Sequence, residues 1–95
     1  MPVFLVAARA SNAQDAPPAD LSRLDGLFDD CTHLWPGLAL VQAEASQSRV
    51  YHDAKWSLPD GCGVVVAILE HQPKFKGVQK GALKWVRERW DAMPG

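Results

Sequence analysis

Three short apolar runs constrain the fold of this chain more than any other feature of its sequence. Each run has six residues and contains β-branched side chains, which is typical of buried β-strands. The runs are Val3–Ala8, Leu38–Ala43 and Val64–Leu69. A strand with one solvated face would alternate apolar and polar residues, and these runs do not alternate. We therefore expect a β-sheet that is covered on both faces.

The segments between and after these runs predict three helices and one long loop. Asp20 can cap a helix that continues to about Cys31, and its apolar residues recur at helical spacing. A second helix is expected from Ser46 or Ser48 to about residue 58, and a third over residues 78–90. The polar segment 11–19 contains Pro17-Pro18 and is expected to be a flexible loop.

A Pro-Gly pair at residues 36 and 37 separates two apolar stretches, Thr32–Trp35 and Leu38–Ala43. This arrangement predicts a hairpin with a short first arm, and a single strand from Leu38 is the alternative. The resulting order is β-α-β-β-α-β-α. It predicts an α+β fold, a ferredoxin-like split β-α-β sandwich with an additional C-terminal helix, in a single domain over residues 1–95.

The C-terminal helix is too short to cover the second face of such a sheet. A helix of about 13 residues is about 20 Å long, which is enough for only part of four strands. We therefore expect a homo-oligomer or a protein partner to cover the remainder.

Charge and cysteine content exclude several classes of protein. The 95 residues carry 11 acids and 10 bases, so the chain is not basic overall, and no apolar run approaches the ~20 residues of a membrane span. The two cysteines form no disulfide scaffold and no zinc-binding pattern, which favours a reducing, cytoplasmic location without a membrane partner. Residues 1–10 resemble a signal peptide but lack a basic segment, so we expect a first strand there.

Three segments resemble a known group of proteins at the level of fold. They are PVFLVAA at residues 2–8, LALVQAEASQSRVY at 38–51 and PDGCGVVVAIL at 59–69. Their order resembles small bacterial ferredoxin-like proteins related to SinR and to the nuclease-like subunit of CRISPR adaptation. The nuclease-like members carry a metal-binding acidic residue at the end of the first strand. This chain has Ala7-Ala8-Arg9 there, so the resemblance implies the fold and no nuclease activity.

The second predicted helix has a polar side that carries a tryptophan. Wound at 100° per residue, Arg49, His52 and Trp56 lie together, opposite an apolar stripe. These three residues are a candidate protein-binding patch. The alternative is structural: Trp56 folds over Pro59 or packs on the last helix.

The C-terminal segment is basic, whereas the remainder of the chain is acidic. Residues 72–95 hold six bases and two acids, and residues 1–71 hold four bases and nine acids. The candidate contacts to nucleic acid or to an acidic partner are Lys74, Phe75, Lys76, Lys80, Lys84 and Arg87. A solvated helix face and a protein-docking surface are the alternatives. Arg89 lies within the apolar side of the helix, so we expect it to pair with an acid or to reach solvent.

No catalytic constellation, cofactor site or metal site is predicted. Cys31 and His33 are close in sequence, but neighbours two residues apart do not face each other on a helix. The sequence therefore favours a small non-enzymatic binding or assembly module that self-associates or docks on a protein through its sheet face and last helix. The alternatives are a nucleic-acid-binding protein that uses the C-terminal basic segment and a small inhibitor or accessory protein of a bacterial defence system.

Overall fold

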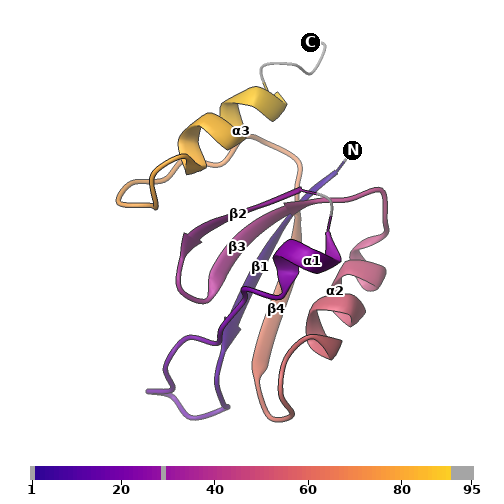
Figure 1. Cartoon of the computed structure of the whole chain (residues 1–95), viewed down its shortest axis with the longest axis vertical. Coiled ribbons are helices and arrows are strands. Elements are labelled where there is room, and N and C mark those ends of the chain that lie inside the picture. Colours follow the sequence, from indigo (N-terminus) through magenta and orange to yellow (C-terminus); the bar gives the residue numbers. More distant parts are fainter. Residues whose placement is uncertain (1, 29, 91–95) are drawn as a thin grey trace.

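A four-stranded antiparallel sheet forms the centre of the computed structural model, which describes residues 2–28 and 30–90 (Figure 1). The strand order is β2-β3-β1-β4. The strands are β1 (Val3–Arg9), β2 (Asp30–Trp35), β3 (Leu38–Gln42) and β4 (Gly63–Leu69). All three predicted apolar runs are therefore strands. The predicted hairpin is also confirmed, because β2 and β3 pair antiparallel around a turn in which Gly37 has a φ of 83°.

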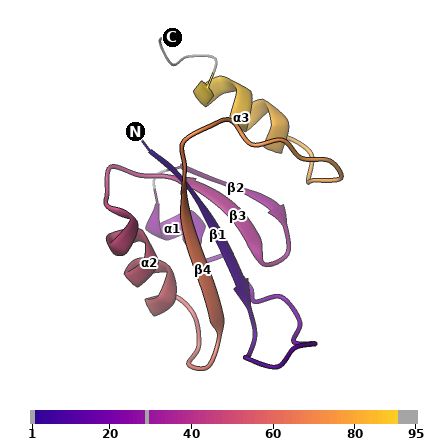
Figure 2. The ribbon, with the colours of Figure 1, turned by 180° about the vertical axis from the view of Figure 1, so that it is seen from behind.

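Three helices accompany the sheet within the described residues: α1 (Leu24–Leu27), α2 (Gln47–Trp56) and α3 (Ala82–Trp90). The predicted element order is confirmed, and the fold is a small α+β fold. Figures 1 and 2 show α1 and α2 on one face of the sheet and α3 at one end of the molecule. Ala82 and Val86 of α3 pack against residues of the other face. None of the helices in these described ranges combines the length and the apolar content that crossing a bilayer requires.

The first helix is much shorter than predicted. The expected helix over residues 20–31 is wrong, because only Leu24–Leu27 is α-helical and β2 already begins at Asp30. Asp20 caps a turn instead, since its Oδ1 accepts a hydrogen bond from the Ser22 N–H at 2.9 Å. Pairing of Asp30 and Cys31 with β3 extends the sheet and removes these residues from the helix.

The second helix agrees with its prediction. Ser46 is the N-cap, and its Oγ accepts a hydrogen bond from the Arg49 N–H at 3.1 Å. Val50 and Ala54 are fully buried against the sheet, as the apolar stripe predicts.

The last helix begins four residues later than predicted, at Ala82. Gly77 and Gly81 have φ values of 74° and 94°, which lie in the left-handed region and are incompatible with a right-handed helix. Val78 still packs against the same core as α3, but it does so from the connecting segment.

Two apolar cores lie on opposite faces of the sheet. The first core, under α1 and α2, includes the buried residues Phe4, Val6, Leu24, Val41 and Val50. The second core, under α3, contains the buried residues Val3, Leu34, Leu40, Ala82 and Val86. The second core lies over β2, β3 and the start of β1, and it leaves Val65 of β4 exposed, so the expectation that the last helix covers part of the sheet is confirmed.

Candidate functional site

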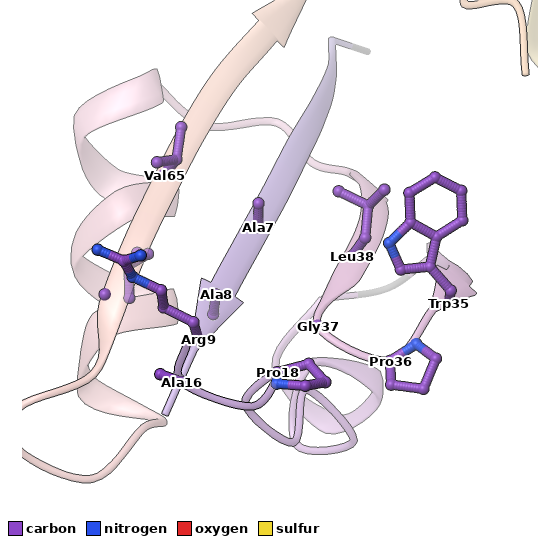
Figure 3. Close-up of a pocket in the computed structure, with 12 residues that line it drawn as sticks. Ala7, Ala8, Arg9, Ala16, Pro18, Trp35, Pro36, Gly37, Leu38 and Val65 are labelled. Carbon is purple, nitrogen blue, oxygen red and sulfur yellow. The ribbon is translucent and has the colours of Figure 1, made fainter. Parts of the chain in front are cut away.

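The uncovered end of the α3-side face carries a continuous apolar surface. Its central residues are the exposed Trp35 and Val65 and the half-buried Ala7 and Leu38, and we call these four the open sheet patch (Figure 3). Leu38 also packs against the edge of the second core. They line a hollow of about 880 Å³. Trp35 exposes 46% of its surface and Val65 exposes 60%, which are large values for apolar residues on a sheet.

Strand register places these side chains in one row. Ala7 of β1 stands opposite Leu38 of β3 on one side and opposite Val65 of β4 on the other. Residues that pair directly across strands share a face of the sheet. The β2–β3 register shifts between His33 and Trp35, and this irregularity sets Trp35 opposite Leu38. Four segments of the sheet thus contribute to one patch.

Arg9 is the single charged residue among those that line the hollow. Its side chain lies across Gly63, where a Cβ atom would come within 3.1 Å of the Arg9 stem. The glycine therefore allows the arginine to lie flat on β4 (Figure 3). No ion pair joins Arg9 to another residue in the part of the chain that the structure describes.

Polar contacts of Asp30 with Trp85 and Arg89 hold α3 against the edge strand β2, and we call these contacts the clasp. Trp85 Nε1 donates a hydrogen bond to Asp30 Oδ1 at 2.8 Å, and Arg89 forms an ion pair with the other oxygen of Asp30. The Arg89 guanidinium also lies 3.7 Å from the centroid of the Trp85 ring. Burial lowers the pKa of Arg89. The expectation that Arg89 pairs with an acid is confirmed.

The candidate patch on α2 is exposed. Trp56 exposes 83% of its surface, so it neither folds over Pro59 nor packs on α3. Arg49 Nε donates to Asp53 Oδ2 at 3.2 Å, and the His52 ring makes an edge contact with Tyr51. The structure brings Arg49, His52 and Trp56 to one outer surface of α2, and their binding role stays a prediction.

Most of the basic candidates also lie in solvent. Lys74, Lys76, Lys80, Lys84 and Arg87 are exposed. Lys84 Nζ lies 3.9 Å from Glu88 Oε1, and this acid partly neutralises the charge of Lys84. Phe75 is different, because its side chain packs against the second core and is half-buried. That position does not favour a role in base stacking, whereas the role of the five bases stays a prediction.

A third cluster was not predicted from the sequence. Asp25 of α1 and Cys31 and His33 of β2 each direct one polar atom to a common point, and these three atoms lie within 4.8 Å of one another. Cys31 and His33 meet because they lie on a strand, where residues two apart share a face. The spacing of Cys31 and His33 would have indicated this cluster if the segment had been assigned as a strand. The prediction of a helix over residues 20–31 excluded that assignment.

The cluster combines a protonated thiol with a hydrogen bond between His33 and Asp25. His33 Nε2 lies 3.0 Å from Asp25 Oδ1 and 4.0 Å from Cys31 Sγ. Burial, together with the Asp25 carboxylate, raises the pKa of the Cys31 thiol to about 12, so the thiol is protonated at neutral pH. A Cys-His-Asp relay needs the thiol and the carboxylate on different ring nitrogens. Here both face Nε2, so the cluster is not arranged as a nucleophilic triad.

Comparison with known proteins adds no further information on the site. No protein-family model matches the chain, and no match is found among curated proteins or solved structures.

Proposed function

We propose that this chain is a non-enzymatic assembly module that forms a homodimer through the open sheet patch. The observation that carries the proposal is that Trp35 and Val65 are exposed on the sheet face that α3 covers only in part. Burial of apolar area contributes about 25 cal/mol per Å², so covering this surface is favourable.

The shape of the patch favours a second copy of the same chain as the partner. Small residues, Ala7 and Gly63, line the hollow, while the large Trp35 ring stands at its rim (Figure 3). In a twofold contact each surface meets itself, so the Trp35 ring of each copy can enter the hollow of the other.

Charge supports the same partner. Arg9 is the single charge on the lining, so the patch lacks both the basic groups that bind a phosphate backbone and the mixed charges that select a polar partner. An apolar surface is buried most favourably against another apolar surface. A second copy of the chain presents such a surface, so no other protein is needed.

A ferredoxin-like assignment of the fold is part of the proposal. The order β2-β3-β1-β4, with every neighbouring pair antiparallel, supports this assignment. In that architecture two helices cover one sheet face and leave the other open, and here α3 covers part of the open face.

The test is the molar mass in solution, measured by light scattering and by sedimentation equilibrium from micromolar to millimolar concentration. We expect about twice the monomer mass of 10.4 kDa for the wild-type chain. The variant Trp35→Ala is expected to be monomeric over the same range, because it removes the ring that fills the hollow.

The matched control is Trp56→Ala, which removes an equally large and more exposed ring from α2. This variant should dimerise like the wild type, and circular dichroism should show that both variants are folded. A wild-type chain that is monomeric at every concentration would overturn the proposal. A dimer that is lost in Trp56→Ala but retained in Trp35→Ala would also overturn it, in favour of the patch on α2.

One observation favours a second candidate function. Lys80, Lys84 and Arg87 are exposed to solvent in the structure. We propose nucleic-acid binding by these three basic residues as the alternative, and an electrophoretic mobility shift across a salt series tests it. A steep loss of binding with salt supports the alternative, and no shift at low salt eliminates it.

A further inference from the structure

We propose that Asp25, Cys31 and His33 form a binding site for one zinc-type divalent metal ion. This site lies on the α1-side face of β2 and does not depend on the proposed dimer. The three residues supply one sulfur, one nitrogen and one oxygen ligand that already converge.

The two distances from His33 are similar to those around a tetrahedral ion. Zn²⁺ has bonds of about 2.0 Å to nitrogen and oxygen and about 2.3 Å to sulfur, which places N and O ligands about 3.3 Å apart and N and S ligands about 3.5 Å apart. The corresponding distances from His33 Nε2 are 3.0 Å to Asp25 Oδ1 and 4.0 Å to Cys31 Sγ. Both distances lie within about 0.5 Å of the tetrahedral values, and all three ligand atoms lie within 4.8 Å of one another.

The kinds of ligand indicate which metal is favoured. Thiolate and imidazole ligands suit Zn²⁺ and similar transition metals, whereas Ca²⁺ and Mg²⁺ prefer sites made of oxygen atoms alone. A thiolate and a carboxylate together carry two negative charges, which balance a divalent cation. On binding, the Sγ–H bond of Cys31 breaks and its proton passes to the buffer. His33 Nε2 gives up the hydrogen that it directs at Asp25, so that the neutral ring keeps its one hydrogen on Nδ1 and metal–sulfur and metal–nitrogen bonds can form.

The position of the site provides an entry path and a free coordination position. Asp25 and His33 line a surface groove of about 490 Å³, together with Asp20 and Trp35. The Asp25 side chain is 59% exposed, so the ion can approach from solvent. Three protein ligands leave the fourth position of a tetrahedral ion to water or to a small ligand in this groove.

The experiment is a titration of the full chain with Co²⁺ and with Zn²⁺. Co²⁺ reports on the site, because thiolate coordination produces a charge-transfer absorption band and a tetrahedral environment produces visible absorption. We expect one equivalent of Co²⁺ to generate both signals, and one equivalent of Zn²⁺ to abolish them by displacement, because the d¹⁰ Zn²⁺ ion loses no ligand-field energy in a tetrahedral site with a thiolate ligand.

Three variants test the ligands. Cys31→Ser should lose the charge-transfer band. Asp25→Asn and His33→Ala should raise the dissociation constant for Zn²⁺ by more than about tenfold, since the loss of even an outer partner of a metal site has an effect of that size. The matched controls are Cys62→Ser and His52→Ala, which remove the same ligand types elsewhere and should leave both metals bound as in the wild type.

Three results would overturn the proposal. They are the absence of a charge-transfer band in the wild type, a band that persists in Cys31→Ser, and Zn²⁺ affinity that falls equally in His52→Ala. The first would show that the Asp25–His33 contact is a hydrogen bond only. The molar mass, measured in parallel with a chelator present, separates this outcome from failure of the proposed dimer.

Discussion

The two faces of the sheet differ in how completely they are covered. On one face, α1 and α2 pack over a core that runs from Phe4 to Ala8 along β1. On the other face, α3 packs over Val3 and Leu40 at one end and leaves Val65 exposed at the other. The same strands build both faces, so the difference lies in the covering helices. We therefore expect the face under α1 and α2, the closed face, to contribute most to the free energy of unfolding. The face that α3 covers in part is the one available for contact with another molecule.

The largest expected effect tests the closed face. Phe4→Ala removes a fully buried ring from the first core. We expect the free energy of unfolding to fall by about 3–5 kcal/mol, because the variant loses apolar transfer energy and leaves a cavity. Urea denaturation followed by circular dichroism measures this change. A loss below about 1 kcal/mol would contradict the view that this face holds the fold together.

A matched pair of valines compares the faces directly. Val50 on α2 and Val86 on α3 are both fully buried, on opposite faces. Val50→Ala should lower the free energy of global unfolding by about 2 kcal/mol. Val86→Ala should lower it less and should instead increase hydrogen exchange in α3, because a terminal helix can detach while the sheet stays folded. Equal global effects in the two variants would show that the faces unfold as one unit.

A smaller effect is expected from the clasp between Asp30 and Arg89. Asp30→Asn keeps an oxygen that can accept from Trp85 but removes the charge that faces the guanidinium. We expect a loss of about 1 kcal/mol, since the carboxylate is partly solvated. Faster hydrogen exchange of α3 amides, with unchanged amides in α2, is the measurement. Unchanged exchange in α3 would mean that the apolar contacts alone hold the helix.

The smallest effect concerns acid sensitivity at the start of the α1 segment. Hydrogen bonds from the Ser22 N–H and from the Ser22 side chain hold the pKa of Asp20 below its ordinary value of 3.8. The folded state therefore favours the carboxylate, so its contribution to stability is present above pH 3.8 and is lost as the pH falls through the folded pKa. An NMR titration of Asp20 should give a midpoint below 3.8. A midpoint at or above 3.8 would show that this turn is not formed in solution.

The sequence predicted the strands better than the short helix, for a physical reason. Unbroken apolar runs have few alternatives to a buried strand, so Val3–Ala8 and Val64–Leu69 were assigned correctly. Residues 20–31 have helical spacing, and Leu24 and Phe28 are indeed buried. Strand pairing of Asp30 with Gln42 nevertheless overrides that local preference, and such pairing is a long-range property that one segment does not encode.

The candidate sites also divide into features that follow from local sequence patterns and features that depend on long-range strand pairing. The incomplete cover of the sheet and the acidic partner of Arg89 were predictable, because both follow from the pattern of apolar positions. The members of the open sheet patch were not, since they depend on the register that joins Ala7 to Leu38 and Val65. The cluster of Asp25, Cys31 and His33 was missed because it requires β2 to begin at Asp30.

The alternation of side chains along β2 links two features that share no atom. Asp30 points to one side of the strand, where it receives Trp85 and Arg89, and Cys31 points to the other, where it meets His33 and Asp25. A one-residue slip of this strand exchanges the two sides. An insertion of one residue before Asp30 that shifts the strand by one position would therefore have two effects. It would remove the contacts that hold the last helix, and it would separate the sulfur, imidazole and carboxylate groups.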